Sequence, residues 1–124
     1  DAEFDDVKTF KAEDIEPNAV KLRSTLELDA VVIHPTKNAA CATEKGSAQL
    51  EGPFCANPKL TTGAGDNFNA GFCLGLLANL EAAELLAAGT ANSGFYVRNA
   101  RSASAKDLVG FMEAWMRNHG DPKF

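Results

Sequence analysis

A glycine-containing junction directly before an apolar helical segment constrains the fold of this chain more than any other feature. Residues 61–77, TTGAGDNFNAGFCLGLL, place two glycines and one aspartate before an apolar run. This run has apolar residues at spacings of three and four, namely Phe68, Phe72, Cys73, Leu76, Leu77 and Leu80. The spacing predicts a helix from Asp66 onward. Cys73, like Cys41, lies in an apolar pattern, so we expect both thiols in the core.

The segments before the junction predict one helix and three strands. Residues 16–28 are typical of a helix, because Pro17 falls near the first turn, where its missing N–H is tolerated. Residues 29–34, DAVVIH, show no alternation and predict a strand that is buried on both faces. Residues 38–43 and 47–52 flank the turn sequence EKG and predict a hairpin.

Two more helices are expected after the junction helix. One runs from Glu81 to about Val97 and is rich in Ala and Leu. The other begins near Ser104, which has the spacing of a capping box to Asp107. This last helix carries an apolar stripe that predicts a core-facing side, formed by Leu108, Phe111, Met112 and Trp115.

The order of these elements indicates an α/β fold with a thin sheet. Strands come early in the chain and three helices come late. A strand that is buried on both faces needs parallel neighbours, and a single hairpin does not supply them. We therefore expect part of the sheet to lie outside these residues.

The composition argues against several classes of protein. A length of 124 residues suits one domain, and 45% hydrophobic residues supply a core. The net charge of -5 argues against nucleic acid as a partner. No apolar run reaches the roughly 18–20 residues that cross a membrane, and the acidic residues 1–14 predict an irregular segment instead of a signal peptide. Three widely spaced cysteines predict neither a disulfide framework nor a zinc site, which favours a cytoplasmic protein.

The junction itself has the chemistry of an anion site. The first amides of a helix have no intrahelical acceptor, and the helix dipole adds positive charge there. Because glycine lets a ligand approach the backbone, the amides of Gly63, Ala64, Gly65 and Asp66 can converge on a phosphoryl group. The Asp66 carboxylate would repel that anion unless it has a task of its own, such as accepting the proton of an attacking hydroxyl. The alternative is that Asp66 only stabilises the helix dipole, by about 0.3–1 kcal/mol.

The longer string TTGAGDNFNAGF, residues 61–72, closely resembles the C-terminal signature of the ribokinase-like (PfkB) carbohydrate kinases, roughly D-T-x-G-A-G-D-x-F-x-x-G. The matching positions are Thr61, Gly63, Ala64, Gly65, Asp66, Phe68 and Gly71. The resemblance covers residues 29–118. It implies the C-terminal portion of a three-layer α/β/α fold, in which a strand and a hairpin are followed by three helices.

The resemblance also implies an activity, namely ATP-dependent phosphorylation of a hydroxyl on a sugar or related small alcohol. It gives Asp66 the role of the catalytic base and makes Gly63, Ala64 and Gly65 the anion hole. ATP and Mg²⁺ are the implied cofactors. The Asn-x-x-Glu motif that such kinases associate with magnesium is absent here, so no residue of this chain is a candidate metal ligand. These residues do not indicate which sugar is the substrate.

Nucleotide contacts follow from two other parts of the resemblance. Residues 34–39, HPTKNA, take the place of a glycine-containing turn, and residues 89–99 resemble the helix that borders the adenine pocket. The candidates are Thr36, Lys37, Asn38, Asn92 and Ser93. Lys37 has the alternative of a solvated loop lysine, and the two helical residues have the alternative of buried polar groups. Leu60 replaces the family's aspartate, which puts a potassium requirement in doubt.

Kinases of this family are considerably longer than 124 residues. We therefore expect residues 1–124 to be the C-terminal part of one kinase domain, inactive by itself and prone to self-association as a homo-oligomer. The rival interpretation is a non-catalytic nucleotide-binding or regulatory module, which Leu60 and the altered turn near Thr36 favour.

Overall fold

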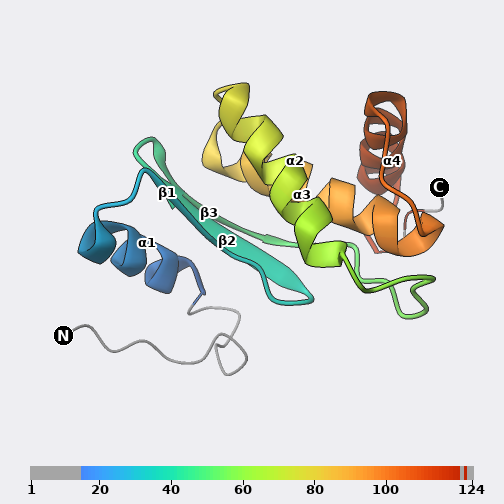
Figure 1. The fold of residues 1–124 in the computed structure, drawn as a ribbon, viewed down its shortest axis with the longest axis horizontal. Coiled ribbons are helices and arrows are strands. Elements are labelled where there is room, and N and C mark those ends of the chain that lie inside the picture. The colour runs from blue at the N-terminus through green and yellow to red at the C-terminus, as the bar shows by residue number, and fades with distance from the viewer. Residues whose placement is uncertain (1–14, 121, 123–124) are drawn as a thin grey trace.

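The structure is a computed structural model that describes residues 15–120 and residue 122. In this part of the chain the elements are α1 (Ile15–Leu26), β1 (Ala30–Ile33), β2 (Asn38–Thr43), β3 (Gly46–Glu51), α2 (Ala64–Leu77), α3 (Ala82–Asn99) and α4 (Ala105–Arg117) (Figure 1). A helix, a strand and a hairpin precede the junction and three helices follow it, as predicted. The irregular segment predicted for residues 1–14 lies outside the described residues.

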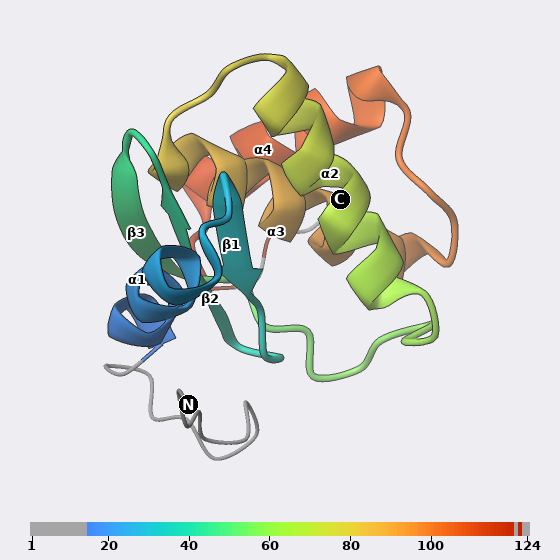
Figure 2. The ribbon, with the colours of Figure 1, turned by 60° about the vertical axis from the view of Figure 1, so that its left-hand side comes forward.

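The described elements form three layers. The sheet has the strand order β1-β2-β3, and both neighbouring pairs are antiparallel. Helix α1 covers one face of the sheet, while α2 and α3 lie on the other (Figure 2). Helix α4 packs against α3. This arrangement confirms the predicted α/β fold with α/β/α layering.

Strand β2 is the centre of the fold because its small side chains allow helices to approach from both faces. Ala39 and Cys41 pack against α2 and α3, whereas Ala40 and Ala42 pack against α1. The predicted core position of Cys41 is confirmed, since its side chain is fully buried. Burial raises the pKa of the Cys41 thiol to about 11, so the thiol stays protonated at neutral pH.

The prediction that residues 29–34 form a strand is confirmed for Ala30–Ile33, but the predicted burial on both faces is incomplete. Among the described residues, β1 lies at an edge of the sheet and pairs with β2 alone, in antiparallel orientation. Val31 and Val32 are half-buried, and Ile33 alone in this strand is fully buried. The apolar run does face both helical layers, because Val32 packs toward α2 and α3 while Val31 and Ile33 pack toward α1. In the part of the chain that the structure describes, one edge of β1 has no partner strand, which is why its burial is incomplete.

Helices α2 and α3 pack closely because a glycine lies at their contact. A Cβ on Gly71 would lie 2.5 Å from the carbonyl oxygen of Ala88, closer than any side chain tolerates. The buried face of α2 consists of Phe68, Gly71, Phe72 and Gly75. Cys73 is exposed, so its predicted core position is wrong. The glycine face turns inward and leaves Leu77, 87% exposed, on the outer side.

Helix α4 begins with the predicted capping box. The Ser104 hydroxyl accepts a hydrogen bond from the amide of Asp107 at 3.1 Å, and the Asp107 carboxylate accepts one from the amide of Ser104 at 2.9 Å. Phe111 is fully buried, and its ring meets Phe95 edge-on with centroids 6.5 Å apart. The rest of the stripe packs around this pair, namely Leu108, Met112 and Trp115. The predicted core-facing side is confirmed.

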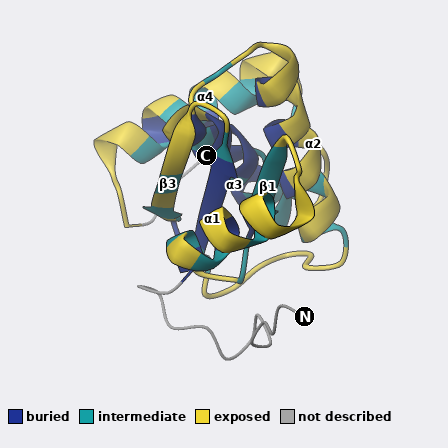
Figure 3. Cartoon of the chain, turned by 90° about the vertical axis from the view of Figure 1, so that its left-hand side faces the viewer, coloured by how far each residue is buried: buried dark blue, intermediate teal, exposed yellow. Residues whose placement is uncertain are grey.

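Exposure is uneven across the three layers. β3, at the second edge of the sheet, alternates between exposed and half-buried residues (Figure 3). Much of α1 is also exposed, so this layer buries mainly Ile15 and Ala19. Within the described ranges, no helix combines the length and the apolar character needed to cross a membrane.

Candidate active site

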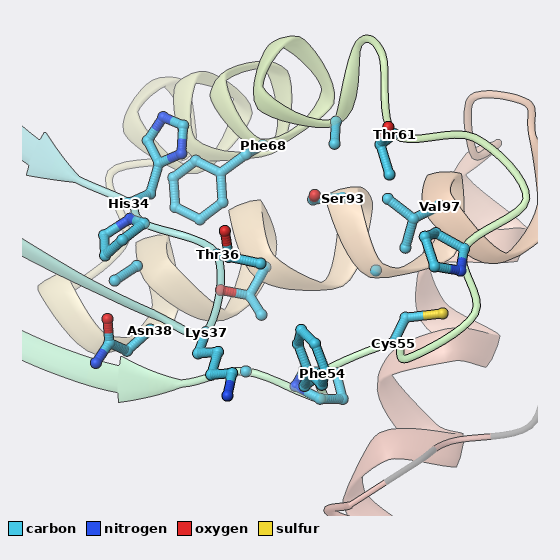
Figure 4. Close-up of a pocket in the computed structure, with 18 of the residues that line it drawn as sticks. His34, Thr36, Lys37, Asn38, Phe54, Cys55, Thr61, Phe68, Ser93 and Val97 are labelled. Atoms are coloured by element: carbon cyan, nitrogen blue, oxygen red, sulfur yellow. The ribbon is translucent and has the colours of Figure 1, made fainter. Parts of the chain in front are cut away.

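A pocket of about 960 Å³ lies where the β1–β2 connection, the loop before α2 and one side of α3 meet. Ala64 and Gly65, at the start of α2, form one end of it. Figure 4 shows Ser93 and Val97 of α3 across the pocket from Thr36 of the β1–β2 connection. Segments far apart in the sequence therefore face one space, and the N-terminus of a helix opens into it.

The loop before α2 enters the helix through Gly63. This residue is the N-cap, and its φ of 93° lies in the left-handed region that favours glycine. No side chain caps this helix start in the described part of the chain. The amides of Gly65 and Asp66 follow in the first turn, where a helix offers them no acceptor of its own. The helix therefore presents donors, and the positive end of its dipole, at the end of the pocket.

Backbone hydrogen bonds hold this turn in place. The amide of Ala64 donates to the carbonyl oxygen of Thr61 at 3.0 Å. The carbonyl oxygen of Gly63 accepts from the amide of Asn67 at 3.0 Å and from its side-chain amide at 2.9 Å. Of the three predicted anion-hole residues, Ala64 and Gly65 line the pocket and Gly63 precedes them in the chain. Asp66 is exposed and directly follows the lining residue Gly65.

The predicted nucleotide contacts come together except for one. Thr36, Lys37, Asn38 and Ser93 all line the pocket. Asn92 is the neighbour of Ser93 on α3, but its side-chain amide donates to the backbone carbonyl of Asn67 at 2.7 Å. It therefore ties α3 to α2, which is the alternative that the sequence left open for it.

Phe54 is a pocket residue that the sequence analysis missed. Its side chain is 47% exposed, and the amine of Lys37 lies 5.0 Å from the centre of its ring. A cation over an aromatic ring is attracted to the ring face. Figure 4 shows the pair at one side of the pocket. An aromatic residue in a loop between Pro53 and Pro58 was the one signal that could have found it.

His34 is a second lining residue to which the sequence assigned no role. Its ring stacks on Phe68 with centroids 4.3 Å apart, and its Cε1 atom lies 3.6 Å from where a Cβ on Gly65 would be. Burial lowers the pKa of the His34 imidazole, and a hydrogen bond with the Asn69 side chain opposes that shift. The shift in pKa therefore favours the neutral form of the imidazole. As an isolated histidine it carried no sequence signal.

Comparison with known proteins identifies the family. The family model for prokaryotic ketohexokinase matches residues 3–115, which is most of the chain. The chain belongs to this family. The match includes the junction, the pocket and every candidate site residue, and it begins well before residue 29, where the resemblance to the ribokinase-like kinases starts.

One curated protein and one solved structure are similar to this member of the prokaryotic ketohexokinase family. A ketohexokinase of Haloferax volcanii is 34% identical over 83 residues, which are 67% of this chain and 22% of that protein. The crystal structure of a Thermoplasma acidophilum protein assigned as a ribokinase has a TM-score of 0.52 at 15% identity, covering 90% of this chain and 46% of that one. The second likeness shows the ribokinase fold. The chain thus spans about a fifth of the curated relative and about half of the solved structure.

ATP and Mg²⁺ are the two cofactors predicted for this ketohexokinase family member, and the described residues bear on them differently. The pocket joins apolar walls to hydroxyl groups and a helix N-terminus, a combination that suits a nucleotide. Among residues 15–120 and 122, no group of three or more His, Cys, Asp and Glu side chains could hold a metal ion. That absence does not bear on Mg²⁺ held by one or two carboxylates together with phosphate oxygens, which is how kinases usually bind it.

Proposed function

We propose that the full-length protein transfers a phosphoryl group from ATP to a hydroxyl of a ketohexose. One observation carries the proposal, namely the helix N-terminus without a side-chain cap that opens into the pocket at Ala64 and Gly65. Membership of the prokaryotic ketohexokinase family supports it, and the name of the Haloferax relative supports the sugar class. The free cysteines support a cytoplasmic location.

The nucleotide would occupy the pocket between the β1–β2 connection and α3. Thr36 and Asn38 supply polar contacts there, Lys37 supplies a cation, and Ser93 lies on the facing helix. Asn92 would have to leave the Asn67 carbonyl in order to contribute. When bound, ATP supplies the phosphoryl group that is transferred. These residues would hold the nucleotide beside the start of α2.

The amides of residues 63–65 form the anion hole in this proposal. They would donate to the oxygens of the transferring phosphoryl group, whose negative charge is also favoured by the α2 dipole. The Ala64 amide would exchange its Thr61 acceptor, now at 3.0 Å, for one of these oxygens. Because Gly65 has no side chain, the phosphoryl group can approach its amide closely.

The Asp66 carboxylate acts as the base. It accepts the proton of the sugar hydroxyl as the hydroxyl oxygen forms its bond to phosphorus and the bond from phosphorus to the ADP oxygen breaks. Its exposed position in the first turn leaves it accessible to a substrate. Residues outside this chain would complete the sugar site, and we propose that residues 1–124 alone, as a monomer or a homo-oligomer, do not catalyse transfer.

The test is Asp66→Asn in the full-length protein, assayed by ADP release with a panel of ketohexoses and other sugars. Transfer should fall by about 10²–10⁴-fold, the range for loss of a general base, while ATP affinity stays close to that of the parent protein. Asp107→Asn is the matched control, because Asp107 occupies the same third position of a helix that contributes no residue to the pocket.

Two outcomes would contradict the proposal. Near-normal turnover in Asp66→Asn would remove Asp66 as the base. ATP binding by the parent protein without sugar-dependent ADP release would indicate the rival function, a non-catalytic nucleotide-binding module.

A further inference from the structure

The side chain of Tyr96 lies against the turn that leads into α2. Its hydroxyl donates a hydrogen bond to the carbonyl oxygen of Thr62 at 2.6 Å. The same hydroxyl oxygen lies 2.8 Å from the position that a Cβ on Gly63 would take, and the ring carbon Cζ lies 3.3 Å from it. Two constraints therefore favour glycine at position 63, namely its left-handed backbone conformation and the nearby side chain of Tyr96.

The next two residues of α3 hold earlier points of the same loop. The carbonyl oxygen of Val97 accepts from the amide of Lys59 at 2.7 Å. The guanidinium of Arg98 donates to the carbonyl oxygen of Pro53 at 2.9 Å. One turn of α3 therefore fixes the loop from the pocket wall to the start of α2, and Tyr96 makes the contact nearest to the junction.

The contact at Thr62 determines where the Gly63 amide points. The carbonyl of Thr62 and the N–H of Gly63 belong to one planar peptide group and point in opposite directions across it. A donor that holds the Thr62 oxygen therefore also sets the direction of the Gly63 N–H. Donors that are fixed before the reaction stabilise developing charge without a reorganisation cost.

We propose that Tyr96 is a positioning residue for phosphoryl transfer, because its hydroxyl, acting through Thr62, orients the anion-hole amides that begin at Gly63. The inference rests on the proposed function. The inference also explains why residue 63 is a glycine where residue 96 is a tyrosine. Any Cβ at position 63 would collide with the Tyr96 hydroxyl that orients the turn.

The kinetic test is Tyr96→Phe in the full-length protein, which removes only the hydroxyl. We expect kcat for sugar phosphorylation to fall about tenfold, with the KM for ATP within about twofold of the parent value, since the ring and the pocket walls remain. Ser47→Ala is the matched control, because its hydroxyl makes a similar bond, 2.7 Å to the carboxylate of Glu16, far from the pocket. An unchanged kcat, or a loss confined to KM, would overturn the inference.

A double-mutant cycle in the full-length protein tests the same contact without activity. Gly63→Ala should raise the equilibrium constant for unfolding in urea in both backgrounds. The increase should be about fivefold smaller in Tyr96→Phe than in the parent, because the hydroxyl that lies 2.8 Å from the new Cβ is gone. A Gly63→Ala protein that folds only in that background gives the same support. Equal effects in the two backgrounds would overturn the inference. A parent protein that phosphorylates no sugar would defeat the proposed function, and this cycle would then decide whether Tyr96 sets the turn.

Discussion

The N-termini of α2 and α4 differ in how their first amides are satisfied, although both helices have aspartate as their third residue. In α4, Ser104 and Asp107 close a capping box, and Arg101 pairs with the Asp107 carboxylate at 2.8 Å. In α2, Gly63 has no side chain to offer, and Asp66 is exposed to solvent. The same residue type at the same helical position therefore has two different surroundings.

This difference shows how a helix end becomes available to a ligand. A capping side chain stabilises a helix by about 1 kcal/mol and occupies the amides that an anion would need. The N-terminus of α4 is stabilised in this way by Ser104. Among the described residues, the α2 terminus has no such cap, so no capping side chain occupies its first amides beside the pocket. An aspartate in the first turn is therefore ambiguous until the residue at the N-cap is considered.

The largest effect that would sharpen this comparison is expected for Gly65→Ala in the full-length protein. A Cβ here would have His34 Cε1 as its nearest neighbour at 3.6 Å, an ordinary contact, and alanine is favoured over glycine in a helix by about 0.5–1 kcal/mol. The methyl group would also displace a phosphoryl group from the amide, and a misplacement of this kind costs about a hundredfold in rate.

Two measurements on Gly65→Ala check that expectation. Urea unfolding should show a higher free energy of unfolding, and steady-state kinetics should show slower transfer. A variant that loses stability and activity together would mean that Gly65 serves the fold and not the ligand.

Ser104→Ala tests the other helix and should have a smaller effect of a different kind. Removing the cap leaves the Asp107 amide without its acceptor, so the free energy of unfolding should fall by about 1 kcal/mol. Transfer at a temperature well below the unfolding midpoint should stay at the parent rate, because no residue of α4 lines the pocket. A marked loss of kcat in a folded Ser104→Ala protein would contradict the interpretation that the N-terminus of α4 serves stability and that of α2 serves the ligand.

The smallest effect is expected in acid. Hydrogen bonds from Arg101 and then from Ser104 hold the pKa of the Asp107 carboxyl well below its usual range. A carboxyl whose pKa is lowered by folding contributes stability above its unfolded pKa of about 3.9, and that contribution is lost as pH falls toward the folded pKa. Stability should therefore decline more steeply below about pH 4 in the parent than in Asp107→Asn. Unfolding curves that decline in parallel would contradict this role for Asp107.

Features that depend on neighbours in the sequence could be predicted. The helices, the hairpin around residues 44–46 and the capping box of α4 follow from residue spacing, and the structure confirms them. The junction at Gly63 was also apparent, because glycines before an apolar helix are a local pattern. The structure places Ala64 and Gly65 at the pocket, while their catalytic roles stay predictions.

Features that depend on packing between distant segments could not be predicted. An apolar run does not indicate which strand lies at the edge. The strand at residues 29–34 was therefore expected to have neighbours on both sides, whereas the central strand is the alanine-rich β2, which was predicted only as one arm of a hairpin. Helical periodicity is judged from apolar side chains such as leucine, and glycine is ignored. Cys73 was therefore predicted in the core, although Gly71 and Gly75 belong to the buried face of α2 and Cys73 is exposed. Tyr96 contacts Thr62 across a separation of 34 residues, which no local pattern reveals.

The small side chains of β2 also affect how the sheet acquires its strand register. A shift of one residue along the strand would exchange Ala39 and Cys41 for Ala40 and Ala42, and these pairs are of nearly equal size. The side chains of β2 therefore discriminate weakly between alternative pairings. The turn does so instead, since the Thr43 hydroxyl accepts from the Lys45 amide at 3.1 Å and donates to the Gly46 carbonyl at 3.3 Å. We expect mispaired hairpins to form during refolding when that hydroxyl is removed, even though the core itself is unchanged.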